Sequence, residues 1–341
     1  MINTIYRLVS PKQFEVTYQE VDLNERQVMV RPTHLSICKA DQRYYLGDRD
    51  PEILNEKLPM ALIHEGIGEV VYDPTGNFQV GDLVVLIPNI PQEEDDFISE
   101  NYLDSSQFRS SGFDGYLQEY VATSPDRIVK LPSSLNPEVA AFTELISVCL
   151  HSICRLEKVS HPHGKVVGVW GDGNVGFITS LLLKTIYPHK KVIVFGKNLE
   201  RMSYFTFADQ VYTINQIPPG LTIDEAFECV GGIKSQSAIE QIIEHLSPEG
   251  VISLLGVSEY HIPINTRLIL EKGLFLYGSS RSGRVDFERV LDIFQKHPLI
   301  LSYLEELVIE KVRIRKIEDI KEAFERDVSA DLGKVILIWD K

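Results

Sequence analysis

The sequence predicts an α/β protein in which a doubly wound, parallel-sheet domain interrupts a mainly β domain. Residues 1 to about 140 contain short β-favouring runs separated by Gly, Pro, Asn and Asp turns. From about residue 165, strands alternate with helical segments, which is typical of a parallel sheet covered by helices on both faces. The chain closes with another strand, GKVILIW. We therefore expect one domain to comprise residues 1–142 and 286–341 and the other to comprise 143–285.

The first domain is expected to be a barrel or sandwich. Its strand candidates are QVMVRPTHLSI, GIGEVVYD, GDLVVLIP, GYLQEYVAT and RIVKLP. No helical period of useful length appears in this part, so we expect no helix before residue 137. A single long helix, NPEVAAFTELISVCLHSICRLEKV, should follow, with Asn136 as its cap and Pro137 at its first position.

Composition excludes several classes of function. The 341 residues carry a net charge of −15, whereas binding to nucleic acid requires a basic surface. The N-terminus lacks the apolar stretch of a secretory signal, and no apolar run approaches the ~20 residues of a membrane helix. Four scattered cysteines do not make a disulfide scaffold. We expect a cytoplasmic protein with neither a nucleic-acid partner nor a membrane partner.

The stretch GVWGDGNVG places Gly171, Gly173 and Gly176 in the G-x-G-x-x-G spacing. It follows an apolar strand and opens an apolar helix, which is the context of a dinucleotide site. The first glycine permits a tight turn, the second lets the pyrophosphate approach, and the third allows close helix–strand packing. Asn174 and Val175 begin the helix whose positive end would hold the pyrophosphate.

The end of the next strand predicts which dinucleotide binds. NAD sites usually carry an acid about 20 residues beyond the glycines, where it accepts bonds from the ribose. That place holds Gly196, followed by Lys197, Asn198 and Arg201. A glycine leaves room and the cations supply charge for a 2′-phosphate, so the sequence favours NADP(H).

His64 and Glu65 stand side by side in LPMALIHEGIGEVV, between two strand candidates. A polar turn is one interpretation and a metal site is the other. A catalytic zinc takes three ligands from Cys, His and carboxylate and leaves a position open. Cys38 lies upstream, and Glu144 lies on the helix that leads into the second domain. Alone, each would be an ordinary buried thiol or surface charge.

Together, these residues resemble the medium-chain, zinc-dependent alcohol and polyol dehydrogenases. ICKAD, HEGIGEVV, VGDLVV, GYLQEYV, GDGNVG and FECVGG correspond to landmarks of that family along the whole chain. The resemblance implies a GroES-like barrel as the catalytic domain and a Rossmann domain for the nucleotide. It also implies a homo-oligomer, either a dimer or a tetramer.

The resemblance further implies that Cys38, His64 and Glu144 are zinc ligands and that Glu65 is a neighbouring carboxylate able to approach the metal. Whether Glu65 or Glu144 is the resting third ligand stays open. The metal would act as a Lewis acid on a carbonyl, and the cofactor would carry the hydride.

Several residues depart from the family pattern. The lobe NIPQEEDDFISENYLDSSQFRSS lacks the four cysteines of a structural zinc, so we expect one catalytic ion and no structural one. Ile63 and Lys39 replace two glycines, and Ala40 replaces the hydroxyl residue that relays the alcohol proton. Proton transfer would then use metal-bound water, Tyr44 or another group.

Cations near the predicted zinc site favour a phosphorylated substrate. Lys39 and Arg43 closely follow Cys38, and GSSRSGR adds Arg281 and Arg284. ICKADQRYYLGDR and YGSSRSGRVDF are similar to the ribulose-5-phosphate reductases, which supply CDP-ribitol for teichoic acids and related polymers. That resemblance implies NADPH-dependent reduction of D-ribulose 5-phosphate to D-ribitol 5-phosphate, with a cytidylyltransferase as the enzyme that could take the product.

Two other functions stay open at this point. One is a zinc polyol or alcohol dehydrogenase that acts on another sugar alcohol or ketose, for which an acid at position 196 would have argued. The other is a non-catalytic NADPH-binding protein, which would need the glycines but not Cys38, His64 and Glu144.

Overall fold

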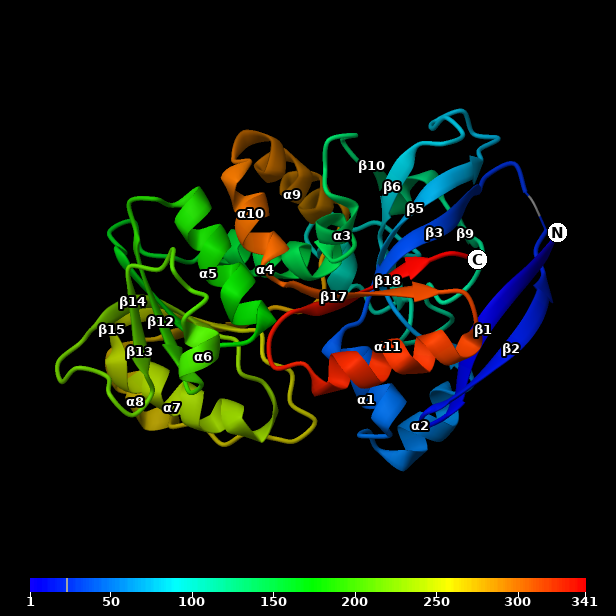
Figure 1. Cartoon of the computed structure of the whole chain (residues 1–341). Helices are drawn as coiled ribbons and strands as arrows, with labels where there is room; N and C mark the ends of the chain where they lie inside the picture. The colour runs from blue at the N-terminus through cyan, green and yellow to red at the C-terminus, as the bar shows by residue number, and fades with distance from the viewer. Residues whose placement is uncertain (23) are drawn as a thin grey trace. The chain divides into compact units, whose positions relative to one another are not determined.

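The computed structural model describes residues 1–22 and 24–341. The chain forms two compact units: the first contains Met1–Leu145 and Ser282–Lys341, and the second contains Ile146–Arg281. The second unit therefore interrupts the first in sequence (Figure 1).

The first unit is built on β-sheets. Its largest sheet has the order β10-β6-β5-β3-β18-β17, and β9 also pairs with β3. A smaller sheet has the order β2-β1-β4, and β7 pairs with β8. The strands are β1 (Ile2–Ser10), β2 (Gln13–Glu20), β3 (Val28–Ser36), β4 (Met60–Ala61), β5 (Glu65–Tyr72), β6 (Leu83–Leu86), β7 (Asn89–Ile90), β8 (Gln107–Phe108), β9 (Val121–Thr123), β10 (Ile128–Lys130), β17 (Val308–Ile314) and β18 (Lys334–Trp339).

Strand direction gathers three strand ends at one edge of the large sheet. β3 runs antiparallel to both β5 and β18, with Ser36 opposite Glu65 on one side and opposite Ile336 on the other. The end of β3 therefore lies beside the first residues of β5 and β18 (Figure 1). Cys38 follows this end of β3, so the topology alone places it near Glu65 and Lys334.

Two helices before residue 137 contradict our expectation of none: α1 (Lys39–Leu46) and α2 (Pro51–Lys57). In α1, the backbone N–H of Cys38 donates to Asp41 at the N-terminal end, and Gly47 ends the helix with φ 79. Asp50 caps α2. Each helix is at most eight residues long, which is too short for apolar periodicity to reveal it.

The long helix predicted after Asn136 is two helices. Asn136 caps α3 (Pro137–Ala140), as predicted, by accepting a bond from the N–H of Glu138. The helix is then interrupted before α4 (Thr143–Leu156), where the Thr143 hydroxyl donates to the carbonyl of Ala140. This break places Glu144 in the first turn of a new helix.

The core of the first unit draws on both ends of the chain. Tyr45 and Phe324 stack at 4.8 Å, and Tyr6 meets Trp339 edge-on at 5.4 Å. The last segment thus completes the first unit rather than the second. Its helices are α9 (Arg284–Lys296), α10 (Leu299–Glu305) and α11 (Ile317–Ser329).

Glu100 organises the lobe in which the resemblance would place a structural zinc. Its carboxylate pairs with Arg127 at 2.8 Å and accepts the N–H of Arg284 at 2.8 Å. Its carbonyl accepts bonds from Asn89 and Ser106. A buried cation–carboxylate network therefore connects this lobe to β7, to the start of β10 and to α9.

The second unit is a six-stranded parallel sheet with the order β13-β12-β11-β14-β15-β16. The order reverses between β11 and β14, and ligands of such sheets bind at the carboxyl ends of the strands at this point. The elements are β11 (Val166–Trp170), α5 (Asn174–Ile186), β12 (Lys191–Gly196), α6 (Leu199–Met202), β13 (Gln210–Thr213), β14 (Ile223–Glu228), α7 (Ser235–His245), β15 (Leu246–Leu254), α8 (Thr266–Lys272) and β16 (Phe275–Gly278).

Within residues 1–22 and 24–341, no helix combines the length and the apolar character needed to cross a bilayer.

Candidate active site

Three of the predicted metal ligands meet in the first unit. The ligand atoms of Cys38, His64 and Glu65 all lie within 4.8 Å of one another. His64 is 5% exposed and Glu65 is fully buried. Cys38 comes from the end of β3, and the other two come from the start of β5, so this cluster depends directly on the antiparallel pairing of those strands.

Asp41 connects the loops that carry these ligands, although sequence reasoning did not single it out. Its carboxylate accepts bonds from the N–H of Cys38, the N–H of Ile63 and the hydroxyl of Ser110. It also lies 3.5 Å from Nδ1 of His64. Since Nδ1 faces Asp41, the other ring nitrogen is left for a metal, which is a common arrangement for histidine ligands.

Ile63 adopts the backbone conformation that explains the glycine usual at its position. Its φ is 71, in the left-handed region that a β-branched residue rarely enters. Asp41 accepts its N–H, and its carbonyl accepts the N–H of Tyr116 at 2.7 Å. These contacts hold a strained residue directly before His64.

Glu144 is a second buried carboxylate of the site. Its pKa is raised to about 7, chiefly by burial and also by the charge of Glu65, while His64 and Lys334 oppose the shift. Glu144 is not part of the compact group formed by Cys38, His64 and Glu65. Its assignment as the third ligand stays a prediction.

The chemistry of these donors fits a divalent cation. Burial raises the pKa of the Cys38 thiol, just as it raises that of Glu144. The buried thiol of Cys38 and the buried carboxyl group of Glu144 therefore resist ionisation unless a cation is present. A bound metal reverses that penalty, and a set of thiolate, imidazole and carboxylate suits zinc.

Lys334 is the buried cation of this region, and sequence reasoning missed it as well. Its Nζ lies 2.9 Å from Oε1 and 2.7 Å from Oε2 of Glu65, and it donates to the carbonyl of Ile37 at 2.8 Å. Lys334 and Glu65 are 269 residues apart. No local pattern could have paired them.

Three of the residues predicted to bind substrate, Lys39, Arg43 and Tyr44, lie on helix α1. Lys39 follows Cys38 on the surface of α1, where its Nζ contacts Gln42 at 3.2 Å, and Arg43 lies one turn further along. Tyr44 is 2% exposed within the core, and the guanidinium of Arg49 lies 4.1 Å from its ring centre. The substrate roles of these residues stay predictions.

The two arginines of GSSRSGR differ in their placement. Arg281 belongs to the second unit and has a φ of 58. Arg284 belongs to the first unit, where it bonds to Glu288 and to the carbonyls of Asp126 and Ile128. Those bonds give Arg284 a structural task.

The glycine-rich turn has the backbone geometry that its spacing predicts. Gly171 has φ 136, and a Cβ there would lie 2.8 Å from the carbonyl oxygen of Cys229. Gly173 precedes α5 and faces open space, so a ligand can approach its backbone. A Cβ on Gly176 would collide with the carbonyl of Gly171. The three glycines thus serve the turn, the ligand approach and the close packing in that order.

The end of β12 differs from our interpretation of Gly196. The space that we assigned to a 2′-phosphate is filled, because a Cβ at Gly196 would lie within 2.9 Å of Met202 and Asp172. Asp172, from the glycine-rich turn, accepts the N–H groups of Lys197 and Asn198. Gly196 is therefore required for packing, and the exposed Lys197 side chain supplies positive charge beside it.

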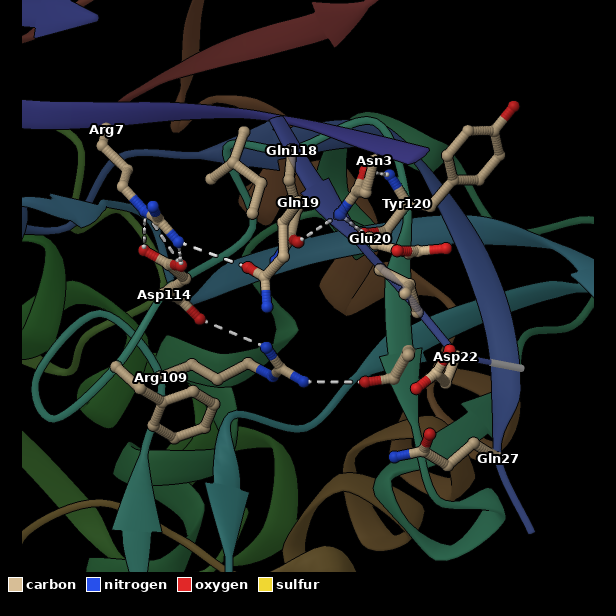
Figure 2. A pocket seen from close by; sticks show the side chains of 14 residues that line it. Asn3, Arg7, Gln19, Glu20, Asp22, Gln27, Arg109, Asp114, Gln118 and Tyr120 are labelled. Carbon is tan, nitrogen blue, oxygen red and sulfur yellow. Dashed lines mark hydrogen bonds and ion pairs between the residues drawn. The ribbon is translucent and has the colours of Figure 1, made fainter. Parts of the chain in front are cut away.

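The first unit also contains a polar hollow of about 520 Å³ (Figure 2). Arg7 pairs with Asp114 across it at 2.6 Å, and Arg109 donates to the carbonyls of Asp114 and Ala122. None of the predicted catalytic or substrate residues lines this hollow. Its two cations are already engaged by acceptors of the chain.

Comparison with known proteins identifies the class and then the family. Residues 24–133 match the model of the alcohol dehydrogenase GroES-like domain, and with the parallel nucleotide-binding sheet this defines a medium-chain dehydrogenase. The chain is 55% identical to ribulose-5-phosphate reductase of Bacillus spizizenii, over all of both chains, and 54% identical to ribulose-5-phosphate reductase 1 of Staphylococcus aureus, over 99% of both. It belongs to the ribulose-5-phosphate reductase family of medium-chain dehydrogenases.

A solved structure agrees with this placement. The crystal structure of S. aureus TarJ in complex with NADPH covers all of both chains with a TM-score of 0.90 and 49% identity.

Proposed function

We propose that the protein reduces D-ribulose 5-phosphate to D-ribitol 5-phosphate with NADPH. The observation that carries this proposal is the 55% identity, over the full length of both chains, to a ribulose-5-phosphate reductase. The similarity to TarJ in complex with NADPH supports the choice of cofactor. The cluster of Cys38, His64 and Glu65 supports a metal site, and the geometry of the glycine turn supports a cofactor site.

The metal would be zinc, held by Cys38, His64 and one of the carboxylates Glu144 and Glu65. When bound, zinc would polarise the ketone oxygen and NADPH would supply the hydride. Asp41 holds the His64 ring and the Cys38 backbone in place for this task. Because Ala40 has no hydroxyl, the proton that completes the alcohol reaches the oxygen by a route other than that residue.

The second unit would bind NADPH through the turn at Gly171, Gly173 and Gly176, with Asn174 and Val175 at the start of α5. Lys197, Asn198 and Arg201 would form the wall around the 2′-phosphate. Asp172 supports this wall, because it accepts two backbone N–H groups there and lies 3.8 Å from Arg201.

The phosphate of the substrate would be held by cations around Cys38. We assign this role to Lys39 and Arg43 of α1, because an ester dianion needs local positive charge in a protein of net charge −15. Arg281, in the second unit, is a separate candidate for binding the phosphate. Tyr44 would then be one candidate for the proton transfer that completes the alcohol.

We also propose that the enzyme works in the cytoplasm as a dimer or tetramer and passes its product to a cytidylyltransferase. The cytoplasm would keep the thiol of Cys38 reduced, as metal binding requires. The transferase would convert D-ribitol 5-phosphate into CDP-ribitol for teichoic acids or related polymers.

The test is NADPH oxidation by the purified protein with D-ribulose 5-phosphate, beside unphosphorylated D-ribulose. We expect turnover of the phosphate ester and little of the free sugar. Cys38→Ser should lose turnover while NADPH binding, followed by cofactor fluorescence, persists. Equal turnover of both sugars would contradict the phosphate site, and an unaffected Cys38→Ser variant would contradict the metal assignment.

A further inference from the structure

Lys334 stands where the three gathered strand ends of the large sheet meet. It is the first residue of β18, Glu65 is the first residue of β5, and Ile37 follows the last residue of β3. Lys334 is 3% exposed. A lysine is rarely buried so completely unless it has charged partners. Its position therefore calls for an explanation beyond packing.

The ammonium group donates hydrogen bonds to two residues at the metal cluster. It donates to the carbonyl of Ile37 at 2.8 Å and to Oε1 of Glu65 at 2.9 Å. Ile37 directly precedes Cys38, and Glu65 directly follows His64. One side chain thus contacts both segments that carry the metal-binding atoms.

The second oxygen of Glu65 is held less completely. Oε2 lies 2.7 Å from Nζ of Lys334, but it is not aligned for a hydrogen bond and has no other donor among the described residues. At the same time, a carboxylate oxygen of Glu65 lies within 4.8 Å of the ligand atoms of Cys38 and His64, so the three could bind one ion. This carboxylate can therefore face either the ammonium or a metal.

The charges of the region determine whether the Glu65 carboxylate faces Lys334 or the metal. Cys38 as thiolate and Glu144 as carboxylate would neutralise a bound divalent ion, and Lys334 neutralises Glu65. Without the ammonium, Glu65 would be a buried and unpaired anion, which costs several kcal/mol. The nearest remaining cation would be the metal. Glu65 would then occupy the position that a substrate oxygen needs.

We propose that Lys334 is a positioning residue: by pairing with Glu65, it keeps this carboxylate from coordinating the metal and so leaves one coordination position open. The inference rests on the proposed metal site and goes beyond it. It assigns Glu144 as the carboxylate that binds the metal and Lys334 as the residue that decides between Glu144 and Glu65.

The neighbourhood allows Lys334 to be replaced without removing its other contacts. Asp327 also lies near Lys334, but it accepts bonds from Gln42 and from the N–H of Val335. Those bonds tie α11, α1 and β18 together without the lysine. Lys334→Met keeps an unbranched side chain, one atom shorter, and removes the charge, so the variant should fold.

The experiment compares cobalt(II)-loaded wild type, Lys334→Met, Glu65→Gln and the double variant, by visible absorption and by the rate of metal loss to a chelator. In Lys334→Met, we expect the visible bands of the bound ion to shift, because the Glu65 carboxylate replaces solvent at the fourth position. Metal loss should slow by about tenfold and kcat should fall by about tenfold. The double variant should regain the wild-type spectrum, and Glu65→Gln alone should keep it.

Three outcomes would overturn the inference. A wild-type spectrum in Lys334→Met with a lower Tm would leave the lysine a structural role only. A changed spectrum in Glu65→Gln alone would make Glu65 the resting ligand. A wild type that binds no cobalt would remove the metal site itself. A different sugar as the preferred substrate would instead contradict the proposed function and leave the spectra, recorded without substrate, as a separate result.

Discussion

The metal cluster of the first unit and the glycine turn of the second are organised in opposite ways. Cys38, His64 and Glu65 are positioned by two charged side chains: Asp41, three residues after Cys38, and Lys334, which is 269 residues from Glu65. The glycine turn lies within six consecutive residues, and its shape depends on where side chains are absent. Removal of a charge should therefore break the first site, and addition of a carbon should break the second.

The largest effect is expected for Asp41→Ala. The substitution leaves the N–H groups of Cys38 and Ile63 and the hydroxyl of Ser110 without their buried acceptor. Each such loss costs about 1–3 kcal/mol, so the free energy of unfolding of the first unit should fall by several kcal/mol. Metal content should fall with it, while the second unit still binds NADPH.

Urea denaturation and metal analysis of the purified protein would measure both effects. Ser110→Ala is the matched control, since it removes one of the three bonds and should cost only about 1 kcal/mol. Full metal content and unchanged stability in Asp41→Ala would mean that the ligand loops hold themselves in place.

The next effect tests the second half of the comparison. Gly176→Ala adds one carbon that would collide with the carbonyl of Gly171, so the turn must open. We expect the Kd for NADPH to rise by at least about tenfold, or about 1.4 kcal/mol, with metal content unchanged. Gly173→Ala adds the same carbon in open space, and it should leave the free energy of unfolding unchanged and hinder only the approach of the ligand.

Calorimetric titration with NADPH and thermal unfolding of both variants would separate these outcomes. Equal stability of the two variants would contradict the packing role of Gly176.

A third prediction concerns charge in the otherwise backbone-built nucleotide site. Lys197→Glu combined with Arg201→Glu should weaken NADPH by at least about tenfold, because each charged hydrogen bond to a phosphate contributes about 1.5–3 kcal/mol. NADH lacks that phosphate and should lose much less. Lys191→Glu, at the opposite end of β12, is the control for net charge. Equal losses of NADPH and NADH would show that these cations do not read the 2′-phosphate.

The same contrast explains what the sequence could predict. The α/β fold class with a GroES-like domain is confirmed by the family model and by the similarity to TarJ, and the prediction of NADP agrees with the NADPH in the TarJ structure. Both predictions follow from contiguous patterns or from landmarks spread along the whole chain. The turn from Gly171 to Gly176 could be interpreted glycine by glycine, since every contact it needs is local.

The parts that sequence reasoning missed depend on contacts between distant segments or on very short elements. Asp41 lies three residues after Cys38, so the capping pattern at the start of α1 could have pointed to it. Lys334 carried no local signal, because its partner is 269 residues away. The room beside Gly196 was assigned wrongly because Asp172 enters it from another loop.

The smallest expected effect concerns the backbone conformation of Ile63, which directly precedes His64 of the metal cluster. Ile63 is fully buried, so replacing it by alanine should cost about 2–5 kcal/mol. At φ 71, however, glycine avoids the left-handed penalty of about 1–2 kcal/mol that alanine retains. Ile63→Gly should therefore be more stable than Ile63→Ala by about 1 kcal/mol. Ile67, equally buried but in ordinary strand conformation within β5, should show the reverse order, with its alanine variant more stable than its glycine variant. Urea denaturation of the four variants measures this directly. The same order at both positions would mean that the strain at Ile63 is absorbed by its neighbours, and that the glycine usual before this histidine is needed for space rather than for conformation.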